Sequence, residues 1–230
     1  MGAMITLIRP DGTPIRGYFA NAGQDRPSVV VIQEWWGLNQ QICSVADRFA
    51  QAGLNALAPD LYQGRVAQDP DEAGHLMNGL DFPGATHQDI RAATDYLKKV
   101  GSSVGVMGYC MGGALTIAAA VHVPGVAAAV CFYGIPPKEF TDPAQIRIPF
   151  QGHFANQDDW CTPQAVDTLE QSIVPLYYDI DNRTGIPTGW LRMVKESIRT
   201  IGPMFSATRM LKEYTTDLYA PAALNQPVED

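Results

Sequence analysis

Residues 108–113 read Gly-Tyr-Cys-Met-Gly-Gly and lie between two apolar runs, Val104 to Met107 and Ala114 to Val121. The first run predicts a buried strand and the second a buried helix, so the glycines stand at a tight strand-to-helix turn. Such a turn holds its central side chain, here Cys110, in a strained and exposed position. This is the Gly-x-Ser-x-Gly pattern of a nucleophile elbow, with cysteine in place of serine. The alternative is a glycine-rich turn around a buried structural cysteine.

The predicted surroundings of Cys110 favour the nucleophilic interpretation. The N-terminus of the following helix stabilises a thiolate. The backbone N–H of Met111 points to the place where the oxyanion of an acyl-transfer reaction would form.

Strand-like and helix-like segments alternate over the first 160 residues. Alternation of this kind predicts an α/β fold, with a mostly parallel, doubly wound sheet and helices on both of its faces. Ligands are then expected at the carboxyl ends of the strands. Strands are predicted at 4–9, 15–20, 28–33, 54–58, 103–107, 126–133 and 147–153, helices at 39–52, 86–100, 113–121 and 162–172, and a loop at 60–84.

Composition excludes several classes of function. The 230 residues carry a formal net charge of −8, so no basic surface is expected for nucleic acid. The apolar stretch from Ala114 to Ile135 is broken by Pro124 and Gly125, which argues against a membrane span. Four scattered cysteines without a C-x-x-C pair predict a reducing cytoplasm, and we expect neither a metal nor a cofactor.

Two further segments carry candidate acids. Glu34 follows the strand at 28–33 and precedes two tryptophans; partial desolvation would raise its pKa and let it store a proton for the thiol. The alternative is a surface glutamate beside two core tryptophans. Asp158 and Asp159 follow the strand at 147–153. In this kind of fold the triad residues occur along the chain in the order nucleophile, acid, histidine, so an acid is expected after this strand. Either could instead be an N-terminal helix charge near Thr162.

These segments together resemble the dienelactone hydrolase family of the α/β-hydrolases, over about residues 15–170. The resemblance implies that Cys110 is the nucleophile and Asp158 the triad acid, with Asp159 left open by the spacing to Pro163. It also implies that Glu34 holds the resting thiol. Trp35 and Met111 would supply the oxyanion hole, and Trp36, Tyr109 and His75 are assigned to substrate binding. The matching stretches are VVVIQEWWGLN, GLNALAPDLYQGR, GYCMGGALT, FYG at 132–134 and GHFANQDDW.

The chain departs from this family at the triad histidine. The family places that histidine downstream of the acid, after one more strand, but no histidine follows His153 here. His153 stands where relatives carry a strand-end histidine that is not the base, and His122 closes an apolar helix. His75 lies in the loop where the family places an arginine for the substrate carboxylate, and it is the remaining candidate base.

The last third of the chain resembles a different family. Its stretches look like the C-terminal tail of α-glucan (glycogen-type) phosphorylases over about residues 167–223, without that family's cofactor lysine or phosphate loop. We therefore expect a chimera of a hydrolase core, 1–170, and a helical tail, 171–230, packed on the core or exchanged between two copies in a homodimer. The stretches are IVPLYYD from 173, PTGW from 187, MVKESI from 193, FSATRMLKEY from 205 and YAPA from 219.

Three functions follow from these resemblances. The first is a cysteine-dependent hydrolase of small-molecule esters or lactones, impaired because it lacks a downstream histidine. The second is a non-catalytic chimeric or domain-exchanged α/β scaffold. A phosphorylase-related activity comes third, because only the tail of that family is present.

Overall fold

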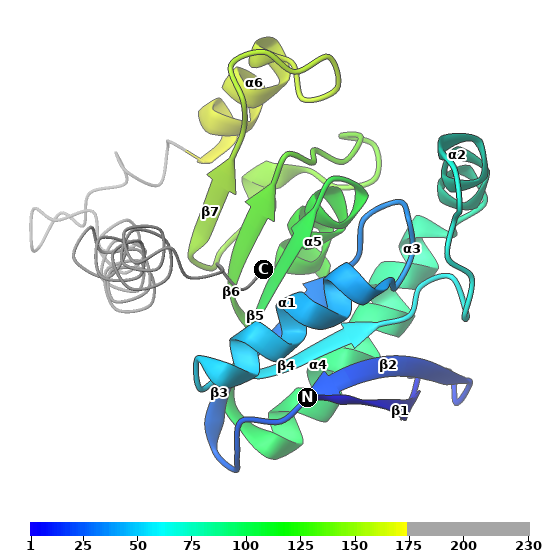
Figure 1. Ribbon diagram of the computed structural model, residues 1–230. Coiled ribbons are helices and arrows are strands. Elements are labelled where there is room, and N and C mark those ends of the chain that lie inside the picture. Colours follow the sequence, from blue (N-terminus) through cyan, green and yellow to red (C-terminus); the bar gives the residue numbers. More distant parts are fainter. Residues whose placement is uncertain (174–230) are drawn as a thin grey trace, which may run out of the picture. The chain divides into compact units, whose positions relative to one another are not determined.

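The sheet of this protein has seven strands in the order β1-β2-β4-β3-β5-β6-β7 (Figure 1). The computed structural model describes residues 1–173, so the predicted tail lies outside the described residues. β2 pairs antiparallel with β1 and β4, and every other neighbouring pair is parallel. The mostly parallel α/β fold is therefore confirmed. The strands are β1 (Ala3–Ile8), β2 (Pro14–Ala20), β3 (Arg26–Ile32), β4 (Asn55–Pro59), β5 (Gly101–Tyr109), β6 (Val126–Phe132) and β7 (Phe150–His153).

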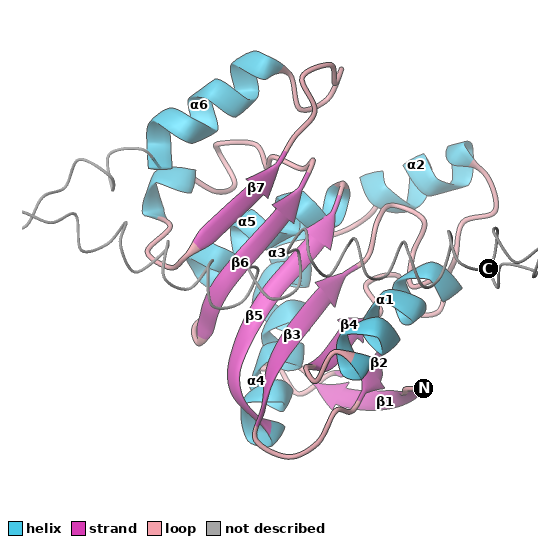
Figure 2. Ribbon diagram, turned by 60° about the vertical axis from the view of Figure 1, so that its left-hand side comes forward, coloured by secondary structure: helices cyan, strands magenta, loops and turns pink. Residues whose placement is uncertain are grey.

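Helices cover both faces of this sheet (Figure 2). α1 packs on one face against β2, β3 and β4, whereas α4 and α5 pack on the other face. None of the helices described here is long and apolar enough to cross a membrane. The helical segments are α1 (Gln40–Gln51), α2 (Pro70–Asn78), α3 (Phe82–Gly84), the π-helical η1 (Ala85–Ile90), α4 (Arg91–Val100), α5 (Met111–His122), the 3-10 turn η2 (Pro143–Gln145) and α6 (Pro163–Ile173).

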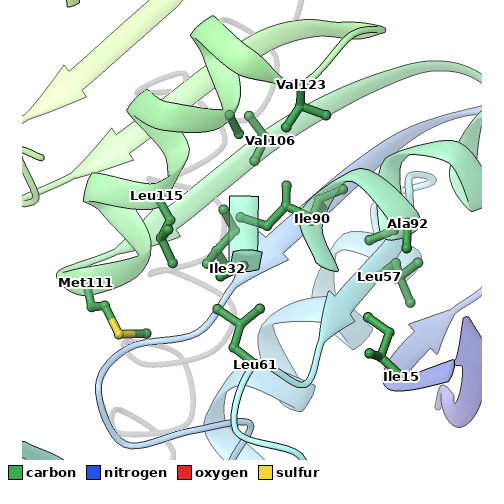
Figure 3. Packing of buried hydrophobic residues seen from close by; sticks show 14 of the residues in the cluster. Ile15, Ile32, Leu57, Leu61, Ile90, Ala92, Val106, Met111, Leu115 and Val123 are labelled. Atoms are coloured by element: carbon green, nitrogen blue, oxygen red, sulfur yellow. The ribbon is translucent and has the colours of Figure 1, made fainter. Parts of the chain in front are cut away.

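The larger core cluster lies between the sheet and α4 and α5 (Figure 3). Ile32 of β3, Ile90 of η1 and Leu115 of α5 are fully buried there. Each such side chain contributes roughly 1.5–3 kcal/mol when it leaves water. This packing fixes the carboxyl ends of β3 and β5, where the candidate site lies.

The loop predicted at 60–84 is wrong, because this stretch contains helix α2 and the short α3. Asp69 is the N-cap of α2 and accepts a hydrogen bond from the Glu72 N–H. Pro70 occupies the first helical turn, where its missing N–H costs nothing. The proline therefore marks a helix start and not a loop.

One predicted helix and one predicted strand differ from the structure in their composition or length. The helix at 86–100 begins with the π-helical η1, where Thr86 Oγ1 donates to the Phe82 carbonyl. The strand at 147–153 is confirmed only as the shorter β7. Pro149 precedes β7 and has no N–H to donate, although its carbonyl accepts from Ala129.

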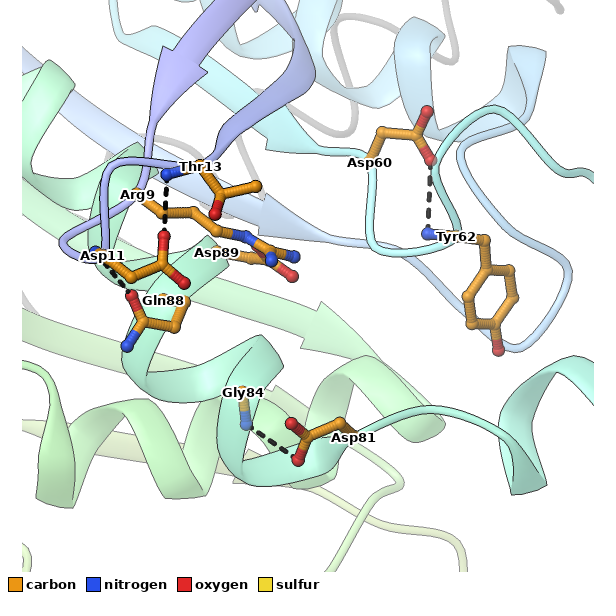
Figure 4. A network of polar contacts seen from close by, with 9 residues as sticks. All are labelled: Arg9, Asp11, Thr13, Asp60, Tyr62, Asp81, Gly84, Gln88 and Asp89. Atoms are coloured by element: carbon orange, nitrogen blue, oxygen red, sulfur yellow. Dashed lines mark hydrogen bonds and ion pairs between the residues drawn. The ribbon is translucent and has the colours of Figure 1, made fainter.

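A polar network ties the β1–β2 hairpin to η1 (Figure 4). Arg9 forms an ion pair with Asp89, which is buried. The Asp11 N–H donates to Gln88 Oε1 at 3.1 Å, and Asp11 Oδ1 accepts from the Thr13 N–H at 2.8 Å. Burial raises the pKa of Asp89, although Arg9 opposes this shift.

Candidate active site

The turn between β5 and α5 holds Cys110 in an unusual backbone conformation. Cys110 has φ 56° and ψ −118°, in the left-handed half of conformational space that side chains rarely adopt. Its N–H donates to the Phe132 carbonyl of β6 at 3.0 Å, and its carbonyl accepts from the Ala114 N–H at 3.1 Å. The strained strand-to-helix turn predicted from the sequence is therefore present.

Close backbone contacts explain two glycines of this turn. A Cβ on Gly108 would lie 2.3 Å from the Gly112 carbonyl oxygen, and one on Gly112 would lie 2.5 Å from the Gln33 carbonyl oxygen. Real Cβ atoms do not approach backbone atoms so closely. Both positions thus require glycine, and this packing brings the ends of β3 and β5 together.

The Cys110 thiol is half-buried and faces acids. Burial raises its pKa most, and the carboxylates of Glu34 and Asp158 raise it further. A hydrogen bond from the Met111 N–H lowers the pKa but does not reverse the shift. The thiol therefore stays protonated near neutral pH.

Glu34 and the two tryptophans form the loop after β3. The Glu34 carbonyl accepts from the Gly37 N–H at 3.2 Å, and Gly37 forms a bridge with Val66. The rings of Trp35 and Trp36 meet edge to face at 5.3 Å and pack against the larger core cluster. Within residues 1–173, the Trp35 N–H has no hydrogen-bond acceptor.

Asp158 and Asp159 lie in different environments. Asp158 is half-buried, and its Oδ1 accepts from the N–H groups of Trp160 and Cys161, both at 2.8 Å. Its charge acts on Cys110. Asp159 is exposed. Asp158 thus accepts hydrogen bonds from the backbone of its own turn and also affects the pKa of the Cys110 thiol.

The histidines make other contacts. In the described part of the chain, none of the four forms a hydrogen bond or ion pair with Cys110 or with the two neighbouring acids. His75 is exposed on α2. His122 lies 3.2 Å from Thr141 Oγ1 and packs against His87. His153 stacks on Phe132 at 4.5 Å and contacts Gln151.

Two tyrosines near the thiol escaped the sequence analysis as site residues. The Tyr133 hydroxyl donates to Glu34 Oε1 at 2.8 Å, and the Tyr62 hydroxyl donates to Met111 Sδ at 3.2 Å. Burial raises the pKa of both hydroxyls, and the charge of a Cys110 thiolate adds to the shift in each. Tyr109, which the family resemblance assigned to substrate binding, packs against Phe132 with tilted rings whose centroids lie 4.9 Å apart.

No group of three or more histidine, cysteine or acidic side chains able to hold a metal ion occurs among residues 1–173. The four cysteines are all free thiols. Burial raises the pKa of Cys131 to about 12 and that of Cys161 to about 11.

The sequence of this chain is similar to proteins of known families. The model of the dienelactone hydrolase family matches residues 15–179, so the match begins where the sequence resemblance begins and ends beyond residue 170. Protein Usf of Aquifex pyrophilus is 32% identical over 213 residues, which cover 86% of this chain and 90% of that protein.

One solved structure and one partial match complete the comparisons. The crystal structure of a candidate dienelactone hydrolase from Klebsiella pneumoniae has a TM-score of 0.64 at 24% identity, and the match covers 85% of this chain and 98% of that one. At this identity it shows the fold alone. A glycogen phosphorylase of Mycobacterium tuberculosis is 39% identical over 67 residues, 29% of this chain and 8% of that enzyme.

Proposed function

Since this chain belongs to the dienelactone hydrolase family, we propose that it hydrolyses small-molecule esters or lactones with Cys110 as the nucleophile. The observation that carries the proposal is the strained backbone of Cys110 between β5 and α5. This conformation projects the side chain from the carboxyl end of the central strand. A structural cysteine has no need of it.

The reaction follows from the groups around the thiol. The Cys110 thiolate adds to the substrate carbonyl, and the N–H groups of Met111 and Trp35 stabilise the oxyanion. The tetrahedral intermediate collapses to a thioester and expels the alkoxide, which takes up the former thiol proton through Glu34 or water and becomes the alcohol. Water then hydrolyses the thioester and restores the thiol. Asp158 takes the place of the triad acid, with Asp159 as the alternative.

We expect this reaction to be slow. A raised pKa leaves little thiolate at neutral pH, and no histidine follows His153 to accept the proton. Loss of a triad member commonly removes several powers of ten in rate. We expect the chain to work in a reducing cytoplasm, where Cys110 remains a thiol.

Replacement of Cys110 tests the proposal. We expect slow turnover of an activated ester by the parent chain and its complete loss in Cys110→Ala, because the proposed thioester forms on the Cys110 sulfur. Cys43→Ala is the matched control, since Cys43 is a half-buried free thiol on α1. Equal rates in the parent and Cys110→Ala would contradict a cysteine nucleophile.

A second candidate is a non-catalytic chimeric scaffold. The thiol faces two carboxylates, and the partial match to a glycogen phosphorylase agrees with a foreign tail. In this proposal the core is 1–170, and the tail, 171–230, covers it or is exchanged between two copies. Sedimentation at two protein concentrations would detect such a homodimer. A phosphorylase-related activity comes last, because that match spans 8% of the enzyme.

A further inference from the structure

Tyr133, the residue after β6, is fixed between the elbow and β7. It has φ 39°, a positive value that is rare for a tyrosine. Its N–H donates to the His153 carbonyl at 2.8 Å. The next residue, Gly134, packs so closely on the elbow that a Cβ would lie 2.0 Å from the Cys110 carbonyl oxygen. The backbone of Tyr133 is thus held by two neighbouring elements in a conformation it would not adopt alone.

The side chain of Tyr133 connects this fixed backbone to Glu34. Its hydroxyl donates to Glu34 Oε1 at 2.8 Å, across 99 positions of the sequence. The ring is 39% exposed and lies 6.4 Å from that of Tyr109. Burial and the Glu34 carboxylate both raise the pKa of the hydroxyl, so it remains a donor throughout the neutral range.

We propose that Tyr133 is a positioning residue that holds the Glu34 carboxylate beside Cys110. Glu34 is half-buried and follows the end of β3 in a loop, so without this donor its side chain can turn toward solvent. This inference rests on the proposed role of Cys110 as the nucleophile.

The position of Glu34 contributes to the pKa of the Cys110 thiol, after the larger effect of burial. The groups that act on Cys110 are the Glu34 and Asp158 carboxylates and the Met111 N–H, while Tyr62, Tyr133 and Cys161 also lie within electrostatic range. A carboxylate held in place disfavours the thiolate. When it moves away, the pKa of Cys110 falls and more thiolate is present at neutral pH.

The rate of alkylation of Cys110 by iodoacetamide, followed against pH by mass spectrometry of its peptide, tests the proposal. We expect the rate at pH 7 to increase about threefold in Tyr133→Phe, because a lower thiol pKa leaves more thiolate, although the lower nucleophilicity of that thiolate offsets part of the gain. Glu34→Gln should raise the rate at least as much. Tyr96→Phe is the control, because Tyr96 lies on α4 and packs against Phe19.

The double variant decides whether Tyr133 acts through Glu34. In a Glu34→Gln background, Tyr133→Phe should change the pH profile no further. An unchanged profile in Tyr133→Phe, or an equal additional change in the double variant, would overturn the proposal. Tyr133→Phe removes one oxygen from a partly exposed ring, and a thermal melt checks that the fold is kept. Failure of the Cys110 proposal is a separate result, because it appears as hydrolysis that survives Cys110→Ala.

Discussion

At the scale of single residues, the turn that carries Cys110 requires glycines, because a Cβ atom at Gly108 or Gly112 would overlap backbone atoms. Gly112 lies in the first turn of α5 and touches the end of β3, with the Gln33 and Ile32 carbonyl oxygens 2.5 and 2.6 Å from where a Cβ would be. Both obstacles are backbone atoms of a central strand, which cannot move without disturbing the sheet. The contact therefore links stability to the geometry of the site.

We expect Gly112→Ala to lower the free energy of unfolding by about 2 kcal/mol or more, through overpacking against β3. Gly74→Ala in α2 is the matched control, because nothing lies within 4 Å of its Cβ position. Alanine should stabilise that helix by up to about 1 kcal/mol. Urea unfolding of both variants measures the difference. Equal stabilities would contradict the close contact at Gly112.

Residue patterns predicted the elbow but not all of its neighbours. Cys110, Glu34 and Asp158 were identified because each follows a recognisable strand, and the structure brings them together. Tyr133 was missed as a site residue although Phe132 to Gly134 belonged to the family resemblance. Its importance lies in a hydrogen bond across 99 positions and in a positive φ, and neither leaves a periodic signal in the sequence.

At the scale of elements, the ion pair between Arg9 and Asp89 attaches the β1–β2 hairpin to η1. We expect Arg9→Met to lower the free energy of unfolding at pH 7 by about 3 kcal/mol, because it leaves a buried carboxylate without its partner. Arg91→Met is the control, since Arg91 and Asp95 are partly exposed on α4 and their pair contributes less than about 0.5 kcal/mol. Urea titrations of both variants measure these losses.

The raised pKa of Asp89 determines how the free energy of unfolding depends on pH. Burial raises its folded pKa above the unfolded value, so the associated stability is fully present below the unfolded pKa and is lost as the pH rises through the folded pKa. Arg9→Met removes the groups that oppose this shift. Its stability deficit should therefore shrink as the pH falls and Asp89 takes up a proton. A deficit independent of pH would show that lost packing of Arg9, and not the buried charge, is responsible.

Element boundaries followed from local signals where those signals were unambiguous. The N-cap at Asn39 and the positive φ of Gly53 frame α1 as the sequence predicts. α2 lies in the stretch predicted as a loop, which contains Pro70, Gly74 and Gly79; these residues usually break helices, although a proline in the first turn suits one. The π-helical start of the next helix has no sequence signature, since it depends on packing against α5.

At the scale of the whole molecule, alternating strands and helices were sufficient to predict the sheet and the edge at which the site lies. The positions of the four histidines bear on the proposed reaction, because a histidine is the expected base of the triad. All four lie at or before residue 153, and within residues 1–173 none forms a hydrogen bond or ion pair with the thiol. We therefore propose that the triad of nucleophile, acid and base is incomplete in this chain, although the strained turn that carries Cys110 is present.

The proposed lack of a triad histidine predicts that an added base accelerates the reaction. We expect imidazole to raise ester turnover severalfold, in proportion to its neutral form, because it can accept the Cys110 proton as a general base. In Cys110→Ala only the direct reaction of imidazole with the ester should remain, and the increase in the parent chain should exceed this background. 2-Methylimidazole separates the two routes, since it keeps the basicity but is a hindered nucleophile. No increase above the Cys110→Ala background would mean that proton removal does not limit the rate, and that another group already serves as the base.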